Sequence, residues 1–204
     1  MALLDLPACE LLDRFASPAP TPGGGSAAAW AGATGAALVA MVCAMTRTRT
    51  GTAEERARQA TALGWLGEAG ARLRHLVEED TRAYDEVLAA YRRPKATDEE
   101  KGSRRTAIDA ALARATDVPL ETAEACLVVL KGAQEAAAHG NPSALSDART
   151  GAALAWAGLV GAAENVRINA RGQDALATRL ERAEALAREG RDRALALGLP
   201  LTAS

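Results

Sequence analysis

The stretch SAAAWAGATGAALVAMVCAM at residues 26–45 decides the fold, because it is long, uncharged and built mainly of small residues. Ala, the best helix former, dominates it, and the residues that favour strands are few. A stretch of this length can span a bilayer or form the buried centre of a helical bundle. The later segments are amphipathic and charged, so we expect a central helix over 26–48 of an all-α bundle, with no membrane partner.

Two segments of the chain are nearly identical. Residues 29–37 read AWAGATGAA and residues 155–163 read AWAGLVGAA, and they differ at two positions. Both carry small residues four positions apart, which lie on one helix face and let two helix backbones approach closely. We therefore expect these two Ala/Gly-rich helices to pack together at the centre, although coincidence remains an alternative origin of the repeat in an Ala-rich chain.

The composition of the chain limits its fold and its partners. Of its 204 residues, 49% are hydrophobic but only 3% are aromatic, so the core of a single helical domain over 1–204 must come from small and aliphatic side chains. The 26 acidic and 24 basic side chains give a net charge of -2, which provides no positive field for nucleic acid. The N-terminal residues do not form a signal-peptide pattern, so we expect a cytoplasmic protein.

Caps and breakers divide the chain into about seven helices of an up-and-down bundle. Pro and Gly residues within 18–25 form the first break, after which Ser26 is the expected N-cap of the next helix. Further breaks are expected at 92–95 and 139–142, and one predicted helix ends just before Pro119. The predicted helices cover residues 5–16, 26–48, 53–91, 98–116, 119–138, 144–170 and 174–197.

The cysteines and histidines do not form a metal-binding pattern. Cys9, Cys43 and Cys126 lie far apart without CxxC spacing, and His75 and His139 are the only histidines. Structural zinc sites need four such ligands at characteristic spacings, and secreted disulfide scaffolds need more cysteines. We therefore expect reduced thiols and no metal.

The predicted helix over 53–91 places a carboxylate on its apolar face. Asp80 shares a stripe with Leu73, Val77 and Tyr84, because spacings of three and four return to the same face. Burial of a carboxylate is costly and raises its pKa unless a partner compensates. Asp80 is therefore either a structural bridge to an Arg or a candidate catalytic residue.

A second group of polar residues lies on the predicted helix over 144–170. Asp147 falls in its first turn, where capping free N–H groups is the alternative role. Asn165 lies on the same face, about 27 Å further along a straight helix. The two can serve one site only if the ligand is long, if subunits share sites, or if Gly158 and Gly161 bend the helix.

Two further features are ambiguous by themselves. The run Gly23, Gly24 and Gly25 before Ser26 can bind an anion through free N–H groups or can be an ordinary loop. Without a preceding strand or a following Lys-Ser/Thr pair, it is neither a P-loop nor a dinucleotide fingerprint. Lys95 draws notice because lysine is rare in this arginine-rich chain.

Five motifs follow one another along nearly the whole chain: PTPGGGS at 20–26, EDTRAY at 79–84 with YRRPK at 91–95, VPLE at 118–121, GNP at 140–142 with SDA at 146–148, and NVRIN at 165–169. Together they resemble the cyclodeaminase/cyclohydrolase family, which includes the C-terminal domain of formiminotransferase-cyclodeaminase and stand-alone methenyltetrahydrofolate cyclohydrolases. The resemblance implies an all-helical fold, a homodimer or larger homo-oligomer, and a tetrahydrofolate one-carbon substrate, without a metal or a permanently bound cofactor.

The resemblance also implies a site. A methenyl folate carries a delocalised cation at its reacting carbon and carboxylates on its glutamyl tail, so acceptors are needed at one end and basic groups at the other. We expect Asp80, Asp147 and Lys95 to be catalytic, with Asp80 as the principal base. The residues expected to bind substrate are Gly23, Gly24, Gly25, Ser26, Tyr84, Arg92, Asn141, Ser146, Asn165, Arg167 and Asn169.

Three residues depart from the family pattern. Ser143 stands where another Asn is usual, Arg149 where a Gly is common, and Glu164 where an apolar residue is usual. Because a long cation near Asp147 could neutralise it, a non-catalytic helical oligomer or folate-binding module that has lost activity remains the alternative function. Between the two reactions we expect the cyclohydrolase, since no formiminotransferase domain precedes the motifs.

Overall fold

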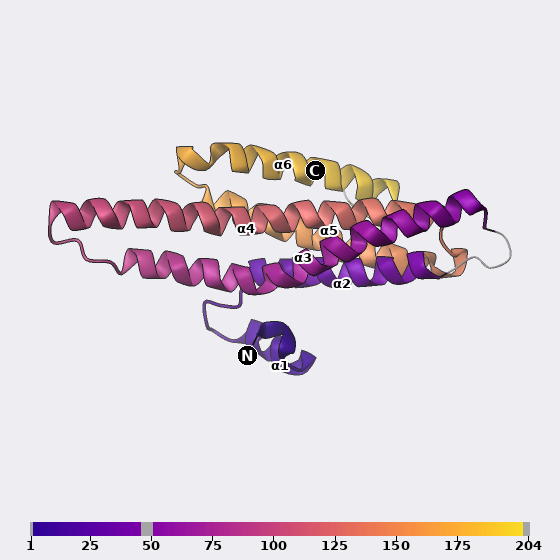
Figure 1. Ribbon diagram of the computed structural model, residues 1–204, viewed down its shortest axis with the longest axis horizontal. Coiled ribbons are helices and arrows are strands. Elements are labelled where there is room, and N and C mark those ends of the chain that lie inside the picture. Colours follow the sequence, from indigo (N-terminus) through magenta and orange to yellow (C-terminus); the bar gives the residue numbers. More distant parts are fainter. Residues whose placement is uncertain (1, 46–50, 202–204) are drawn as a thin grey trace.

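The computed structural model describes residues 2–45 and 51–201, and these form an elongated bundle of helices (Figure 1). The elements are η1 (Leu3–Asp5), α1 (Ala8–Ala16), α2 (Gly24–Ala44), α3 (Ala53–Tyr91), α4 (Asp98–His139), η2 (Pro142–Ala144), α5 (Leu145–Asn169), η3 (Asp174–Leu176) and α6 (Ala177–Ala196). The all-α prediction is confirmed, with six α-helices in the described residues where about seven helices were expected.

Helices α2 and α5 pack closely at the centre of the bundle, as the repeated segments predict. A Cβ atom on Gly35 of α2 would lie 2.5 Å from the carbonyl oxygen of Gly151 in α5. A Cβ atom on Gly158 would lie 2.6 Å from the carbonyl oxygen of Ala28. Only glycine fits at such a distance, so these positions allow the two backbones to touch.

Helix α2 is also the one helix in the described residues that is long and apolar enough to cross a membrane, with 21 residues and a mean hydropathy of 1.7. In the structure it contacts α3, α4 and α5, and Val39 and Val42 are fully buried among them. The prediction of a central helix is therefore confirmed, although α2 ends at Ala44 and residues 46–48 of the predicted helix lie outside the described residues. Only 44% of its apolar stretch is buried, because one face of α2 is turned outward.

Helices α3 and α4 are much longer than the others, with 39 and 42 residues, and pack along each other. Their connected ends extend beyond the other helices as an arm, on the left of Figure 1. Thr52 and Thr97 begin the two helices with capping boxes completed by Glu55 and Glu100. The helix predicted over 53–91 agrees with the observed bounds of α3.

The predicted helix end before Pro119 is wrong, because α4 continues through it without interruption. Proline lacks the N–H that would bond to the carbonyl of Ala115, four residues earlier. That carbonyl instead accepts a hydrogen bond from Nδ2 of Asn169 in α5, at 2.7 Å. A side chain from a neighbouring helix thus supplies the bond that the backbone of α4 cannot make.

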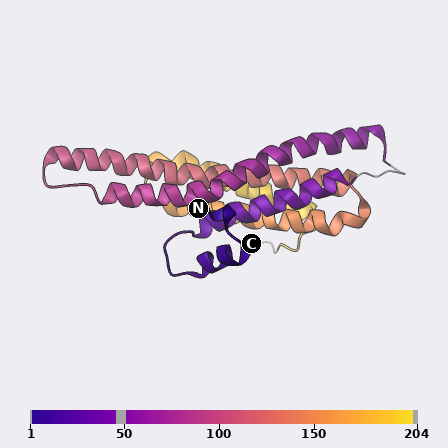
Figure 2. The same ribbon diagram turned by 60° about the horizontal axis from the view of Figure 1, so that its bottom comes forward.

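The remaining helices cover opposite sides of the bundle. Helix α6 packs on α4 and α5, where Arg179 pairs with Asp117 at 2.6 Å. Helix α1 lies on the other side, and the ring of Phe15 stacks on Trp30 with 5.9 Å between centroids. Figure 2, in which the lower side of Figure 1 comes forward, shows α1 and the loop that leads from it into α2. This loop reaches the base of the α3–α4 arm.

Candidate active site

A cavity of about 300 Å³ lies where the α3–α4 arm leaves the bundle. Its lining comes from three of the five motifs: the loop and first turn of α2 within residues 20–25, the stripe of α3 within 80–87, and the end of α5 within 165–169. Leu112 and Ala115 of α4 complete it. Residues that are far apart in the sequence therefore surround one space, and Asp80 is among them.

Asp80 and Ser26 connect α3 to the beginning of α2. The Oδ2 atom of Asp80 accepts hydrogen bonds from the backbone N–H of Ser26 at 2.8 Å and from its hydroxyl at 3.0 Å. The prediction of Ser26 as N-cap is wrong, since α2 begins at Gly24 and Gly23 occupies the cap position. Ser26 lies instead in the first turn, where backbone N–H groups lack helical partners and the helix dipole favours an anion. The carboxylate of Asp80 is that anion.

Gly25 allows the carboxylate to reach the helix. A Cβ atom at this position would lie 2.0 Å from Oδ1 of Asp80, which is far inside a normal contact distance. The glycine run therefore has a structural explanation at one of its three positions, because any larger residue at 25 would displace the carboxylate.

Burial raises the pKa of the Asp80 carboxyl above its ordinary value, and the two hydrogen bonds from Ser26 act in the opposite direction without cancelling the effect. The raised pKa agrees with the prediction made from the position of Asp80 on the apolar face of its helix. None of the ion pairs among the described residues includes Asp80, which removes the alternative of a bridge to an Arg. The adjacent Glu79 is the residue that bridges helices, because Arg114 of α4 donates to it at 2.6 Å and holds its pKa below the ordinary value.

Two side-chain amides on α5 face the same cavity in a fixed orientation. Nδ2 of Asn165 donates to the carbonyl of Gly161 at 2.8 Å, and Nδ2 of Asn169 donates to the carbonyl of Ala115 at 2.7 Å. Each nitrogen uses one of its two N–H groups on a backbone carbonyl, and neither amide oxygen accepts a hydrogen bond from the described residues. No lining residue described by the structure is Lys, Arg or His, so the cavity combines a carboxylate and two amide oxygens without a side-chain cation.

Apolar and aromatic side chains flank these polar groups. Tyr84 lies one turn after Asp80 on α3 and is 39% exposed, and Ile168 on α5 is 66% exposed. Both line the cavity. A pocket with few directed polar groups between apolar surfaces is typical of a site for a small-molecule ligand.

The structure does not bring the residues at the beginning of α5 to this cavity. Asp147 is in the first turn of α5, and Asn165 is near the end of the same helix. Arg149 lies close to Gly198 and forms no ion pair with Asp147 among the described residues, so this structure gives no sign that Arg149 neutralises Asp147. The roles proposed for the residues at this end stay predictions: Asn141, Ser146 and Asp147.

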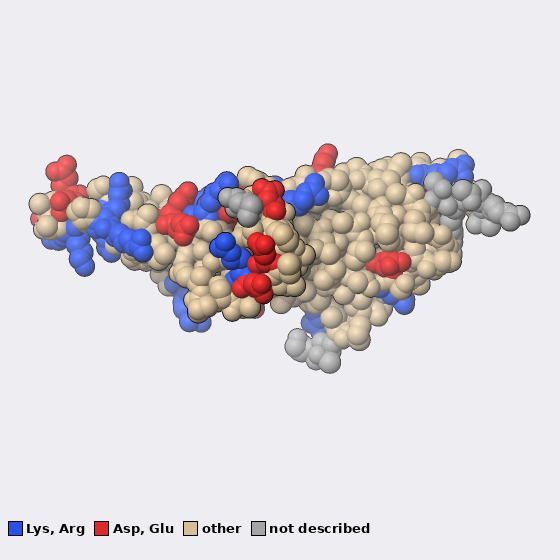
Figure 3. All heavy atoms as spheres, turned by 90° about the horizontal axis from the view of Figure 1, so that it is seen from below, with Lys and Arg blue, Asp and Glu red and all other residues tan. Residues whose placement is uncertain are grey.

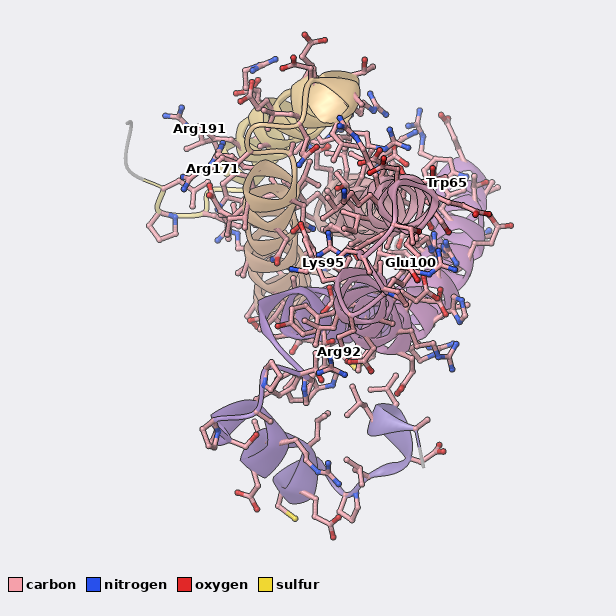
Figure 4. The ribbon with its side chains drawn as sticks, turned by 90° about the vertical axis from the view of Figure 1, so that its left-hand side faces the viewer. Trp65, Arg92, Lys95, Glu100, Arg171 and Arg191 are labelled. Carbon is pink, nitrogen blue, oxygen red and sulfur yellow. The ribbon has the colours of Figure 1, made fainter. Side chains whose placement is uncertain are left out.

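The basic residues expected at the site also lie outside the cavity lining. Arg92 and Lys95 are exposed at the tip of the arm, the end that faces the viewer in Figure 4. Arg167 is exposed near the end of α5 and pairs with Glu164, so one departure from the family pattern engages this cation. Lys95 does not line the cavity beside Asp80, and its catalytic role stays a prediction.

Sequence reasoning missed the contribution of α4 and the apolar part of the lining. Leu112, Ala115 and Ile168 are ordinary residues of amphipathic helices, and such residues carry no signal of a site. One signal was available: Pro119 implies a free carbonyl at Ala115, which needs a donor from elsewhere.

A larger cavity, of about 520 Å³, lies between α3 and α4 on another face. Its basic groups have partners: Arg72 pairs with Glu121, and Nζ of Lys131 lies 4.3 Å from the centre of the Trp65 ring. Trp65 is labelled in Figure 4. The Asp80 cavity is the better candidate for a site that binds a cationic ligand. Its carboxylate and amide oxygens are not paired with a side-chain cation among the described residues.

The described residues contain no group of side chains that is suited to bind a metal ion. In residues 2–45 and 51–201, no three His, Cys, Asp or Glu side chains are grouped as metal ligands would be. Burial raises the pKa of Cys43 to about 11 and that of Cys126 to about 12, which disfavours the thiolate that binds metal. All three cysteines are free.

These features define a class of protein: an all-α bundle whose cavity presents a half-buried carboxylate and oriented amide oxygens. The sequence model of the formiminotransferase-cyclodeaminase family matches residues 7–187, which include every residue that lines the cavity. The chain belongs to this family.

Individual relatives carry related names. The methenyltetrahydrofolate cyclohydrolase of Methylorubrum extorquens is 44% identical over 111 residues, which are 54% of this chain and 53% of that protein. The formimidoyltransferase-cyclodeaminase of Rattus norvegicus is 41% identical over 101 residues, which are 50% of this chain and 19% of the rat protein. The matched segments thus span about half of the bacterial relative and a smaller part of the mammalian one.

A solved structure extends the likeness to nearly the whole chain. The crystal structure of formiminotetrahydrofolate cyclodeaminase from Thermotoga maritima superimposes with a TM-score of 0.80 and 26% sequence identity. The match covers 96% of each chain.

Proposed function

We propose that this protein binds 5,10-methenyltetrahydrofolate in the Asp80 cavity and hydrolyses it to 10-formyltetrahydrofolate. The observation that carries this proposal is the half-buried carboxylate of Asp80, with its raised pKa, in a cavity whose described lining contains no side-chain cation. The bridging carbon of the substrate carries a delocalised positive charge, which such a lining attracts. The likeness to a methenyltetrahydrofolate cyclohydrolase supports the same substrate.

In this reaction a water molecule attacks the methenyl carbon, and Asp80 takes a proton from it. The hydroxyl of the adduct then loses its proton while the bond from that carbon to N5 breaks and N5 takes up a proton, so the formyl group stays on N10 and one proton is released overall. Ser26 holds Oδ2 of Asp80 with two donors, while Oδ1 accepts no hydrogen bond from the described residues. Oδ1 is therefore the atom that takes the proton, and a carboxyl pKa raised above its ordinary value makes it a better base.

Cyclodeamination is a second candidate, favoured by the likeness over nearly the whole chain to a formiminotetrahydrofolate cyclodeaminase. N10 of 5-formiminotetrahydrofolate attacks the formimino carbon, loses its proton, and expels ammonia to give the same methenyl product. The leaving nitrogen needs a proton, which the carboxyl of Asp80 supplies when it is protonated. A raised pKa favours this acid role as well.

The arm offers a place for the other end of the substrate. Arg92 follows Asp80 by twelve positions, which is about 18 Å along a helix axis. We propose that Arg92 and Lys95 bind the carboxylates of the glutamyl tail while the one-carbon unit lies beside Asp80. In this arrangement one extended ligand reaches from the cavity to Arg92 and Lys95 on the arm, so these basic residues belong to the same binding site as Asp80.

We also propose a homodimer formed through the outward faces of α2 and α5. No charged residue occurs between Ser17 and Thr46 or in residues 150–163. Met41 on α2 and Val160 on α5 are exposed, at 43% and 37%. Figure 3 shows the consequence as a broad surface over the right half of the molecule with few charged side chains. A second copy of the chain can bury such a surface.

The methenyl chromophore tests these proposals directly. The purified full chain is given 5,10-methenyltetrahydrofolate in one assay and 5-formiminotetrahydrofolate in another, both with a metal chelator and with the uncatalysed rate subtracted. Catalysed loss of absorbance in the first supports the cyclohydrolase, and gain in the second supports the cyclodeaminase. No catalysed change in either assay contradicts both and favours a folate-binding module without activity.

A further inference from the structure

Pro119 removes one hydrogen bond from the middle of α4, at a point that borders the cavity. Its missing N–H leaves the carbonyl of Ala115 without the partner that helix geometry normally provides. Ala115 lines the cavity, and Pro119 is buried one turn further on. The free carbonyl is therefore an acceptor placed beside the site.

Asn169, at the end of α5, donates a hydrogen bond to this carbonyl. Its Nδ2 donates to the carbonyl of Ala115 at 2.7 Å, although the two residues are 54 positions apart in the sequence. The nitrogen and oxygen of an amide point in different directions, so an amide that donates to one carbonyl turns its oxygen elsewhere. Oδ1 of Asn169 accepts no hydrogen bond from the described residues, and Asn169 lines the cavity.

Of the two cavity asparagines on α5, only Asn169 has an amide orientation that depends on a hydrogen bond to α4. The Asn165 amide donates to the carbonyl of Gly161, one turn earlier in its own helix. Its orientation is therefore a local property of α5. The orientation of Asn169, in contrast, depends on a carbonyl that is free only because residue 119 is proline.

We propose that Pro119 and Asn169 form a positioning pair, in which the proline frees the Ala115 carbonyl so that the Asn169 amide is held with its oxygen available to an N–H group of the ligand. The inference rests on the proposed function, because the ligand is the N–H-bearing ring of the tetrahydrofolate substrate. An N–H restored at position 119 would bond to Ala115 within α4 and release the amide of Asn169. Pro119 is thus a positioning residue, and it acts through Asn169.

A double-mutant cycle on the KM for the turned-over folate substrate tests the pair. Pro119→Ala and Asn169→Ala are each expected to raise KM about fivefold, and the double variant is expected to be no worse than the worse single variant. A purely structural role predicts otherwise: Pro119→Ala repairs the helix, so KM stays within twofold of the unmodified protein. That result, or effects of the two substitutions that multiply, overturns the proposal.

Two further variants keep the test decisive. Thr122→Val, one turn from Pro119 and outside the cavity lining, controls for a general disturbance of α4 and is expected to leave KM unchanged. Asn169→Asp keeps the shape of the side chain, loses the donor and leaves α4 intact; KM within twofold of the unmodified protein would overturn the proposal. If the unmodified protein turns over neither folate, the proposed function fails, whereas an active protein with independent substitutions refutes only the pair.

Discussion

The hydroxyl and the backbone N–H of Ser26 donate to the same oxygen of Asp80, at 3.0 and 2.8 Å. One hydrogen-bonded oxygen fixes the carboxylate against the start of α2, and the other oxygen remains for a ligand or a water molecule. Ser26 is fully buried, so the contact is protected from solvent. The position of the proposed base therefore depends on how the start of α2 packs against α3.

Substitution of Gly25 by Ala is expected to displace this carboxylate. The new Cβ atom would lie 2.0 Å from Oδ1 of Asp80, so either the helix or the carboxylate must move, at a cost of about 1–3 kcal/mol. Both kcat and the melting temperature should fall. Gly67→Ala is the control, because a Cβ atom there meets no other group within 4 Å. Unchanged kcat and melting temperature in Gly25→Ala would refute the role of this glycine.

The pH dependence of hydrolysis should report the raised pKa of Asp80. As a base, Asp80 must be ionised, so kcat/KM is expected to rise with pH and to level off above the pH range of an ordinary Asp. The positive charge of the bound substrate lowers the same pKa, so the acid limb of kcat should lie at lower pH than that of kcat/KM. An acid limb in the same place in both profiles would contradict a base beside the cationic carbon.

The same pKa has a consequence for stability. A carboxyl whose pKa is raised by folding binds its proton more tightly in the folded state, so its contribution to stability falls as pH rises from the ordinary Asp pKa through the raised value. The free energy of unfolding of Asp80→Asn, relative to the unmodified protein, should therefore increase over this interval. Urea unfolding at several pH values measures the difference, and a difference that is constant with pH would contradict the raised pKa.

Lys95→Ala is expected to raise KM about twofold to fivefold, as for the loss of an exposed ion pair. Because Lys95 lies at the tip of the arm, outside the cavity lining, kcat should stay close to that of the unmodified protein. Lys101→Ala is the matched control on the same arm, since this lysine pairs with Asp98 at 2.8 Å. An unchanged KM for Lys95→Ala would remove this residue from the binding site.

Light scattering at about micromolar concentration should give the mass of a dimer or a larger assembly. Val160→Glu places a charge on the uncharged face of α5 and is expected to yield monomers that keep their helical circular dichroism. Leu195→Glu on α6 alters a similarly exposed apolar side chain, at 43%, on another side of the molecule and should leave the assembly intact. A monodisperse monomer of the unmodified protein would refute the proposed interface.

The sequence predicts the centre of the fold well, because small residues at helical spacing allow two helix backbones to pack closely. The repeated segments indicate that α2 and α5 pack closely, and the structure places the tight contacts at Gly35 and Gly158. The prediction failed at Pro119, where the local rule for proline is sound but a side chain from α5 replaces the lost hydrogen bond. Such a tertiary contact cannot be derived from residues near the proline.

The site was predictable in part. Asp80 is recognisable because its helix puts it among apolar residues, and the structure places it in a cavity with Asn165 and Asn169. The motifs that carry Asp147 and Lys95 give the identities of residues but not the distances between them. The structure separates both residues from this cavity.

The most direct test of the account is the kcat of Asp80→Asn on the folate substrate. The substitution keeps the shape and an acceptor for Ser26, so the fold should persist while kcat falls by about 10²-fold or more. Glu79→Gln is the matched control: it alters the adjacent carboxylate that binds Arg114, and it should lower the melting temperature with little effect on kcat. An Asp80→Asn variant that melts early but retains the kcat of the unmodified protein would contradict the central claim.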